Sequence, residues 1–315
     1  MTGVKIISTG SALPSRVVTN DDLSKIEETS DEWIKKRTGI EKRHFTAEGE
    51  SANSLAVESA GRALEKSGIS KDEIGLVLTA TLSGDYSTPS VASFMQSALG
   101  LSKDIPYIDI NAACSGAAYA VEIARSYLVA NQDKKKPYAL VTGVEELSKL
   151  LDPADRTTNI LFGDGAGSVV MTTKEGPYAS TLGAESSLAI NCPGAKNLRS
   201  YIRMDGKEVF RFAVKILPYC IKETVSKAGL STDDIDYFVC HQANKRIIDH
   251  VVRAMKLPKE KFYCNVDHIG NTSGASIFIL LDEMEQKGML SPGDTALLSG
   301  FGSGLTWGSV LVTYK

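Results

Sequence analysis

Short apolar runs rich in Val, Ile and Leu alternate with longer segments of helical periodicity along the whole chain. The short runs have the length and composition of buried strands, and the longer segments have the spacing of amphipathic helices. This alternation favours an α/β fold over an all-α or all-β fold. The predicted strands are Ile74–Ala80, Tyr107–Asn111, Tyr138–Thr142, Gly167–Thr172, Tyr237–Cys240, Ala296–Ser299 and Ser309–Tyr314, and the predicted helices are Ala52–Ser67, Ser115–Ala130, Val209–Ala228, Arg246–Met255 and Ala275–Lys287.

Four segments recur in the same order later in the chain, which indicates an internal duplication. EKSGISKDEIGLVL resembles SKAGLSTDDIDYFV, with their glycines 229 − 68 = 161 residues apart. SGA recurs at an offset of 158, ALVTG recurs as ALLSG at 157, and GSVVM recurs as GSVLV at 141. We therefore predict two halves of one βα fold, residues 1–173 and 174–315, whose equivalent loops meet across a pseudo-two-fold axis.

Composition and charge narrow the classes of function. The net charge of −3 gives no global attraction to nucleic acid. No apolar run approaches the roughly 20 residues that span a bilayer, and the start of the chain lacks a signal-peptide pattern, so we expect a cytoplasmic protein without membrane insertion. The cysteines are odd in number and form no CxxC pair, which argues against a disulfide framework and against a metal site. They are Cys114, Cys192, Cys220, Cys240 and Cys264.

Cys114 lies where a predicted strand turns into a predicted helix, in the run DINAACSGAAYAV. Free backbone N–H groups and the positive end of the helix dipole favour a thiolate at such a turn. A free thiol with a pKa of ~8.5 is only slightly ionised at neutral pH, so a lowered pKa would make a stronger nucleophile. A buried packing cysteine in a tight turn would produce the same pattern, so this run alone does not distinguish the two.

Two other polar residues occupy the same kind of turn. His241 follows the run YFVC and could act as a donor or a base, although a single histidine is more often structural. Asn271 in GNTSGAS lies close to Cys114 in the repeat, so both could face one site, although an isolated GN is usually only a turn. The glycine-rich tail Ser299–Tyr314 offers backbone N–H groups for an oxyanion hole. The other histidines lack such a setting and are interpreted as structural or surface residues: His44, His250 and His268.

Nine motifs in order along the chain carry a family resemblance: GSALPSRVVTNDDL, DEWIKKRTGIEKR, AACSG, DPADRTT, FGDGAG, MDGKEVFRFAV, HQANKRI, GNTSGAS and GFGSGLTWGS. Together they resemble the thiolase-fold condensing enzymes of the β-ketoacyl-acyl-carrier-protein synthase III family. The resemblance implies a five-layered αβαβα fold built from two related halves, in agreement with the repeat. It also implies a catalytic triad at Cys114, His241 and Asn271.

A member of this family would be an acyltransferase that initiates fatty acid synthesis by decarboxylative Claisen condensation. The resemblance implies that Cys114 attacks an acyl coenzyme A, acetyl or longer, while the backbone N–H groups of Cys114 and Ser303 hold the oxyanion. His241 and Asn271 would then stabilise the enolate formed when malonyl-acyl-carrier protein loses carbon dioxide. The implied partners are acyl coenzyme A, acyl-carrier protein and a second copy in a homodimer, with no metal and no other cofactor.

The resemblance also assigns residues to substrate binding. Trp33 and Arg156 would stack on the adenine of coenzyme A, and Arg37 would contact its phosphates. The pantetheine tunnel would be lined by Gly206, Phe210, Ala243 and Asn244. Without the resemblance, Trp33 would be interpreted as a core residue and Arg37 as a surface charge.

The chain departs from the family pattern at two positions. Thr88 stands where members with short-chain primers often carry Phe, so the acyl pocket is expected to be longer than acetyl needs. Ser303 replaces a glycine of the oxyanion loop; its N–H remains, but the freedom of the backbone is reduced.

An acidic carrier protein must be recognised by a local basic patch, because this chain is itself slightly acidic. The candidates lie beside the tunnel motifs: Lys207, Arg211, Lys245 and Arg246. Lys207 and Arg211 are four residues apart and share a helix face. Each of these cations alone could equally be a solvated surface charge.

Three other interpretations were weighed. The order Cys, His, Asn also occurs in papain-like cysteine proteases, but the CGSCW-type signature and the disulfides of that class are absent, and the class does not explain the duplication. A catalytically silent partner subunit would not need all three catalytic residues. A sister condensing enzyme of secondary metabolism, of polyketide or alkylquinolone type with a longer primer or another acceptor, is not separated from fatty acid synthesis by the sequence.

Overall fold

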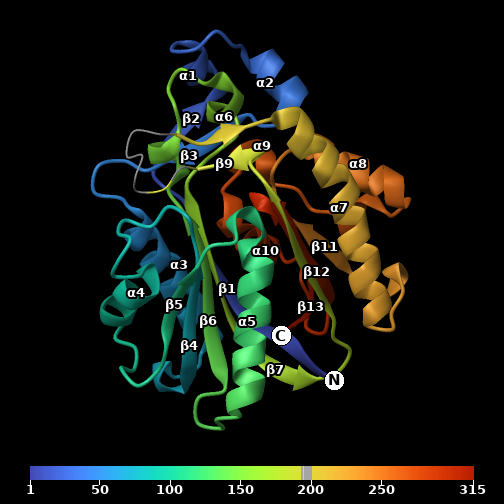
Figure 1. Cartoon of the computed structure of the whole chain (residues 1–315). Helices are drawn as coiled ribbons and strands as arrows, with labels where there is room; N and C mark the ends of the chain where they lie inside the picture. Colours follow the sequence, from blue (N-terminus) through green and yellow to red (C-terminus); the bar gives the residue numbers. More distant parts are fainter. Residues whose placement is uncertain (193, 195–200) are drawn as a thin grey trace.

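The computed structural model describes residues 1–192, 194 and 201–315 (Figure 1). The strands of its main sheet are β1 (Thr2–Ala12), β4 (Ile74–Ala80), β5 (Tyr107–Ile110), β6 (Tyr138–Glu145), β7 (Gly165–Glu175), β8 (Ser180–Ser187), β11 (Tyr237–Cys240), β12 (Thr295–Gly302) and β13 (Gly304–Tyr314). Their order is β11-β12-β13-β1-β7-β6-β4-β5, and β8 pairs with β13. Two small sheets pair β2 (Arg16–Thr19) with β3 (Lys42–Phe45), and β9 (Ile190–Asn191) with β10 (Arg203–Met204).

Helices cover both outer faces and fill the centre. The longer ones are α2 (Asp31–Thr38), α3 (Ala52–Ser67), α4 (Val91–Leu99), α5 (Gly116–Asn131), α7 (Gly206–Lys227), α8 (Lys245–Met255) and α10 (Ser276–Gln286). The short ones are α1 (Asn20–Ser24), α6 (Arg156–Asn159) and α9 (Val266–Ile269). None of the helices in the described part of the chain combines the length and the apolar character needed to cross a membrane.

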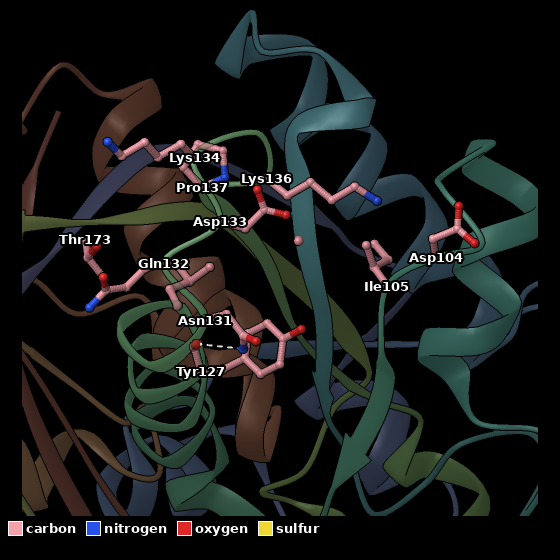
Figure 2. A pocket seen from close by; sticks show the side chains of 12 residues that line it. Asp104, Ile105, Tyr127, Asn131, Gln132, Asp133, Lys134, Lys136, Pro137 and Thr173 are labelled. Carbon is pink, nitrogen blue, oxygen red and sulfur yellow. Dashed lines mark hydrogen bonds between the residues drawn. The ribbon is translucent and has the colours of Figure 1, made fainter.

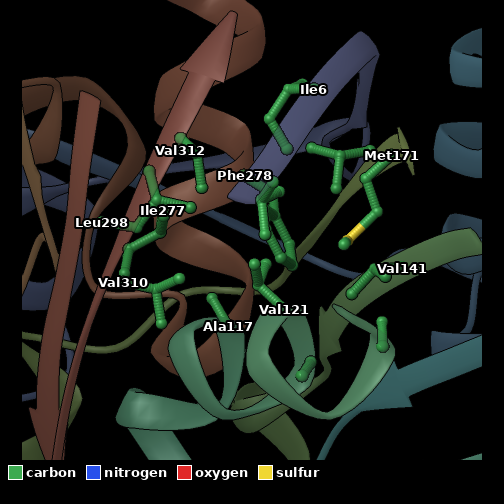
Figure 3. Packing of buried hydrophobic residues seen from close by; sticks show 14 of the residues in the cluster. Ile6, Ala117, Val121, Val141, Met171, Ile277, Phe278, Leu298, Val310 and Val312 are labelled. Carbon is green, nitrogen blue, oxygen red and sulfur yellow. The ribbon is translucent and has the colours of Figure 1, made fainter. Parts of the chain in front are cut away.

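Three of the apolar cores among the described residues lie between the five layers. The central core joins α5 and α10 to strands of both halves, and Figure 3 shows Ala117 and Val121 of α5 beside Phe278 of α10. A second core packs α3 and α4 on β4, β6 and β7, and a third packs α7 and α8 on β11 and β12. The predicted αβαβα layering is therefore confirmed.

The strand pairings repeat between the halves. In the first half β4 and β6 are parallel, and β6-β7 and β7-β1 are antiparallel. In the second half β11 and β12 are parallel, and β12-β13 and β13-β8 are antiparallel. The two halves join where β1 pairs with β13 in parallel. The boundary predicted after residue 173 falls inside β7, which continues to Glu175.

Each half presses its strand-to-helix turn against a central strand of the other half. A Cβ added to Gly300 of β12 would lie 2.9 Å from the carbonyl oxygen of Cys114, and one added to Gly143 of β6 would lie 2.5 Å from that of Gly274. Ala113 and Ser273, one residue earlier in each turn, both have a φ of 46°. The two turns therefore correspond in structure at an offset of 273 − 113 = 160 residues. This differs by two residues from the offset of 158 at which the letters SGA match in the sequence.

Candidate active site

The fold brings the three residues of the predicted triad to one cavity. Cys114, His241 and Asn271 line a narrow space of about 70 Å³ between the two halves. Each residue follows the carboxyl end of a strand or lies in a turn that opens a central helix, so equivalent turns of the two halves supply the site. Within the described residues no group of three or more His, Cys, Asp or Glu side chains could hold a metal ion.

Cys114 lies in the turn that opens α5, and only 6% of it is exposed. Burial raises the pKa of its thiol to about 12, and the charge of Glu145 acts in the same direction. The expected stabilisation of a resting thiolate by the helix terminus is therefore outweighed by desolvation. Cys114 is therefore a thiol at neutral pH, and it would have to lose its proton to act as the predicted nucleophile.

His241 directly follows β11, and its N–H continues the ladder by donating to the carbonyl of Ser299 at 2.8 Å. Burial lowers the pKa of its imidazole to about 3, so the ring is neutral at physiological pH. Its Nδ1 lies 2.7 Å from the hydroxyl oxygen of Ser276, which also accepts a hydrogen bond from the N–H of Gln242 at 3.4 Å. Ser276 can donate its proton to Nδ1, and in that tautomer Nε2 carries a proton that it can donate.

Asn271 is oriented by its own turn. Its Oδ1 accepts a hydrogen bond from the N–H of Ser273 at 2.9 Å, and its backbone N–H donates to the carbonyl of Leu161 at 2.9 Å. With the carbonyl oxygen engaged, the amide Nδ2 is the part of the side chain left to donate to a ligand. Neutral His241 and Asn271 therefore offer two hydrogen-bond donors beside one thiol, which suits the stabilisation of an oxyanion.

A path of cavities leads from the surface to Cys114. The outer cavity has a volume of about 1100 Å³ and shares Gly206, Phe210 and Asn244 with the narrow cavity that holds the triad. All four residues predicted for the pantetheine tunnel line the narrow cavity, since Ala243 does so as well. Beyond Cys114, a third cavity of about 100 Å³ continues between the halves.

The predicted coenzyme A residues gather at the mouth of this path. Two guanidinium groups lie over the ring of Trp33. The guanidinium carbon is 4.7 Å from the ring centroid for Arg37 and 5.1 Å for Arg156. Trp33 and Arg37 line the outer cavity, and Arg156 is exposed and donates to the carbonyl of Glu28. Trp33 is half-buried and packs partly against an apolar core. The interpretation as a core residue therefore applies to only part of its side chain.

Ser303 lies next to Cys114. A Cβ on the preceding Gly302 would stand 2.6 Å from the backbone nitrogen of Cys114, so the two backbones are in contact here. The hydroxyl of Ser303 donates to the carbonyl of Ile190 at 2.7 Å. The side chain of Ser303 is thereby bonded to β9.

Apolar side chains form much of the lining of the inner cavity. Its lining includes Leu82, Leu147, Phe162, Ile190 and Ile202. Thr88, which was predicted to shape the acyl pocket, is exposed on the surface of the chain and does not line this cavity. Within a single copy the structure does not bring Thr88 to Cys114.

Three of the four cations predicted for carrier-protein docking line the outer cavity: Lys207, Arg211 and Arg246. Arg246 also lies over the ring of Phe210, with 5.5 Å from its guanidinium carbon to the ring centroid. Lys245 is exposed but does not line the cavity, because its stem packs on Gly39. The cations thus surround the same opening as Trp33 and Arg37.

A further cavity of about 620 Å³ lies at the other end of α5 (Figure 2). Figure 2 shows Asp104, Asp133, Lys134 and Lys136 around it, and it contains no cysteine or histidine. The 16 residues of α5 separate it from Cys114 by about 24 Å. It therefore takes no part in the chemistry of the triad.

Sequence reasoning missed the residues that hold the triad in place. Arg43 is fully buried and donates to Asn20 and to the carbonyl of Ile160, which ties down the loop that pairs with Asn271. Phe301 packs edge-on against the ring of His241, with 5.6 Å between centroids. Only the spatial arrangement reveals these roles, because an arginine in a charged stretch and a phenylalanine in a strand have no distinctive pattern.

Comparisons with known proteins place the chain among condensing enzymes. Residues 108–187 match a family model described as 3-oxoacyl-[acyl-carrier-protein (ACP)] synthase III, and residues 225–314 match the model of its C-terminal part. The beta-ketoacyl-[acyl-carrier-protein] synthase III of Clostridium tetani is 43% identical over 333 residues, which cover 99% of this chain and 98% of that relative.

Solved structures agree over the whole length of the chain. The crystal structure of 3-oxoacyl-[acyl-carrier-protein] synthase III from Aquifex aeolicus has a TM-score of 0.91 and 41% identity, covering 98% of this chain and 99% of that one. The priming beta-ketosynthase from the R1128 polyketide biosynthetic pathway also has a TM-score of 0.91, at 30% identity, covering 99% of this chain and 96% of that one.

Proposed function

Because this chain belongs to the 3-oxoacyl-acyl-carrier-protein synthase III family, we propose that Cys114, His241 and Asn271 divide the family's reaction between them. The protein is an acyltransferase with a thiolase-like fold that condenses an acyl primer with malonyl-acyl-carrier protein and so initiates fatty acid synthesis. The observation that carries the division of labour is the convergence of one thiol and two neutral donors on a single buried cavity. This family membership excludes a papain-like cysteine protease.

In the first half-reaction Cys114 attacks the thioester carbonyl of an acyl coenzyme A. The developing oxyanion lies against the backbone N–H groups of Cys114 and Ser303. Cys114 lies in the turn that opens α5 and Ser303 in the turn between β12 and β13, and these two turns are in contact. Coenzyme A departs through the cavity that it entered, and the acyl group stays on Cys114. The inner cavity accommodates its chain.

In the second half-reaction malonyl-acyl-carrier protein presents its thioester to His241 and Asn271. The Nε2 proton of His241 and the Nδ2 protons of Asn271 donate to the thioester oxygen as the malonyl group loses carbon dioxide. These bonds stabilise the enolate, and its carbon attacks the acyl-Cys114 thioester. Because the pKa of His241 is lowered to about 3, the ring contributes as a neutral donor rather than as an acid.

Coenzyme A binding requires one side chain to move. An adenine between Trp33 and Arg156 needs about 7 Å between the two flanking groups, since each face requires a carbon–carbon contact of about 3.5 Å. The guanidinium carbon of Arg156 lies 5.1 Å from the ring centroid of Trp33, so Arg156 must swing outward. Its exposure leaves it free to do so.

The carrier protein docks on the cations around the mouth of the path. Lys207, Arg211 and Arg246 are exposed there, and the pantetheine arm of the carrier protein must enter between them. Charges at the rim of an interface mainly set the association rate and its salt dependence.

Reversing Arg211 and Arg246 to Glu is expected to raise KM for malonyl-acyl-carrier protein about tenfold at low salt. The effect shrinks as salt screens the charges, and it is expected to exceed the effect on acylation by coenzyme A thioesters, which enter through the same opening. Arg253→Glu is the matched control, since Arg253 is exposed on α8 but lies outside the cavity. Equal damage to both half-reactions would mean that the two arginines hold the fold or bind coenzyme A instead.

A homodimer would reconcile the exposure of Thr88 with a role in primer selection. The edge strand β5 and its surroundings expose apolar side chains, with Tyr86 60%, Phe94 46% and Ile108 41% exposed. A second copy covering this strip would bury it and bring Thr88 toward the acyl cavity of that copy. In this arrangement Thr88 bounds the partner's pocket, and its small size favours primers longer than acetyl.

Thr88→Phe is therefore expected to suppress acylation by a six-carbon acyl coenzyme A by at least about tenfold while acetyl is spared, since each buried methylene contributes ~0.8 kcal/mol. Ser87→Phe, at the exposed neighbouring position, is the control. The measurement is the mass of the acyl-enzyme formed from a panel of primers. A chain-length profile that ignores the substitution would refute the role of Thr88.

The same panel tests the function itself. The enzyme incubated with acyl coenzyme A and malonyl-acyl-carrier protein is expected to release carbon dioxide and yield a β-ketoacyl-carrier protein, with the acyl adduct on Cys114. A primer preference confined to long or unusual acyl groups would favour the polyketide-priming alternative, which the similarity to the R1128 ketosynthase keeps open.

A further inference from the structure

Glu145, at the end of β6, is a buried carboxylate beside the triad that the two half-reactions leave unused. Its Oε2 accepts hydrogen bonds from the hydroxyl of Ser83 at 2.5 Å and from the N–H of Leu82 at 3.2 Å. Its Oε1 is buried and has no well-formed hydrogen bond among the described residues, although the nearby N–H of Gly274 and hydroxyl of Ser273 lower the pKa of the carboxyl. Burying an unpaired carboxylate oxygen is costly, so a purely structural role for Glu145 explains only one of its two oxygens.

The hydroxyl of Ser273 stands between this carboxylate and the nucleophile. It lowers the pKa of the Cys114 thiol and also that of the Glu145 carboxyl. Ser273 and Cys114 line the same inner cavity, and a Cβ on the adjacent Gly274 would lie 3.6 Å from Oε1 of Glu145. The Ser273 hydroxyl is buried and has no well-formed hydrogen bond to any described residue, so it is available to both the thiol and the carboxylate.

The duplicated halves differ at these positions. At the offset of 160 that relates the two turns, Ser273 corresponds to Ala113 and Gly274 to Cys114. At the offset of 157 that relates Gly143 to Gly300, Glu145 corresponds to Gly302. The hydroxyl of Ser273 in the second half therefore corresponds to a methyl group in the first half, and the carboxylate of Glu145 in the first half corresponds to a hydrogen in the second.

The attack by Cys114 requires an acceptor for the thiol proton. Neutral His241 is a weak base, because burial lowers its pKa to about 3. Burial raises the pKa of Glu145 to about 7, in the range suited to a base at neutral pH. The titratable groups that feel its charge are the thiols of Cys114 and Cys192, and the neighbouring Glu146 is paired with Lys149 at 2.9 Å.

We propose that Ser273 and Glu145 form a proton relay that activates Cys114 for acylation, an inference that rests on the proposed function. As the sulfur bonds to the acyl carbon, its proton passes to Ser273 Oγ and the proton of Ser273 passes to Glu145 Oε1. The tetrahedral intermediate then breaks its bond to the sulfur of coenzyme A. Coenzyme A leaves along the tunnel as a thiolate that solvent protonates, and Glu145 releases its proton to solvent and is ionised again.

The test compares Glu145→Gln and Ser273→Ala with the parent in rapid acylation by acetyl coenzyme A across pH. The parent rate is expected to rise with pH through an inflection near 7, as Glu145 loses its proton. Both variants are expected to acylate about 100-fold more slowly and to lack this inflection. Decarboxylation of malonyl-acyl-carrier protein, which depends on His241 and Asn271, is expected to be unchanged.

Ser83→Ala is the matched control for a structural role. It removes a hydrogen bond that lowers the pKa of Glu145, so the inflection is expected to move to higher pH rather than vanish. Alkylation of Cys114 by iodoacetamide, followed on its peptide by mass spectrometry, is expected to show the same inflection. This readout needs no acyl coenzyme A, so failure of the relay is distinguishable from failure of the proposed function.

The relay is wrong if the parent shows no inflection, if the variants keep the parental rate and profile, or if acylation and decarboxylation fall together. Should Glu145→Gln fail to fold, Ser273→Ala decides alone. Alanine is tolerated at this backbone conformation, because Ala113 has the same φ of 46° in the equivalent turn.

Discussion

Cys114→Ala is expected to abolish acyl transfer from acyl coenzyme A, with a fall of at least about four orders of magnitude, because no other group can carry the covalent intermediate. Decarboxylation of malonyl-acyl-carrier protein is expected to persist, because its two donors do not depend on the sulfur. Mass spectrometry of the intact protein and release of labelled carbon dioxide measure the two half-reactions separately.

Cys264→Ala is the control for the loss of a thiol, since Cys264 is partly buried and lines none of the three connected cavities. It should form the acyl-enzyme like the parent. Cys192 lines the inner cavity with Cys114, so the position of the acyl group must be read from peptides. An acyl group found on Cys192 in the parent would show that Cys114 is not the nucleophile.

His241→Ala and Asn271→Ala should give the opposite result. Each removes one donor to the enolate oxygen, which is expected to lower decarboxylation by about 10²–10³-fold. Acyl-Cys114 should still form in both variants, because neither residue is the nucleophile. Condensation that proceeds unimpaired in either variant would remove that residue from the mechanism.

The pH dependence separates the two possible roles of His241. A neutral donor whose pKa is lowered to about 3 does not change charge between pH 5 and pH 8, so the decarboxylation rate should show no inflection from His241 in that range. An imidazolium acting as a proton donor would instead lose activity as the pH rises. His250→Ala, which alters a histidine on α8 that does not line the cavity, is the control.

The elements predicted best from the sequence are those buried on both faces or bounded by clear caps. The strands β4 and β11 and the helix α3 begin and end as predicted, and α3 lies between Ser51 and Gly68, which cap it. Strand β1 was missed because its polar residues resemble a loop. Ser8 and Thr9 are fully buried in it, and their hydroxyls donate to the carbonyl of Ala63 and to Asp282.

The turns that carry the triad were visible as strand ends followed by small residues. The electrostatics of these turns could not be predicted from the sequence. The direction of the pKa shift of Cys114 depends on how deeply the turn is buried rather than on its position before a helix. The hydroxyl beside His241 comes from Ser276, 35 residues away, and the carboxylate beside Ser273 comes from the other half. No local pattern marks such partners, since only packing brings them together.

The parallel pairing of β1 with β13 has a consequence for synthesis on the ribosome. The strand that joins the halves comes from the final residues, Gly304–Tyr314, and its partner β1 comes from the first ones, so the two chain ends lie side by side (Figure 1). Until β13 has been synthesised, the first half carries β1 with one edge unpaired in the middle of the future sheet. Such an edge is a template for aggregation, so the nascent chain needs shielding until β13 emerges, and a short truncation that removes β13 should harm yield more than its length suggests.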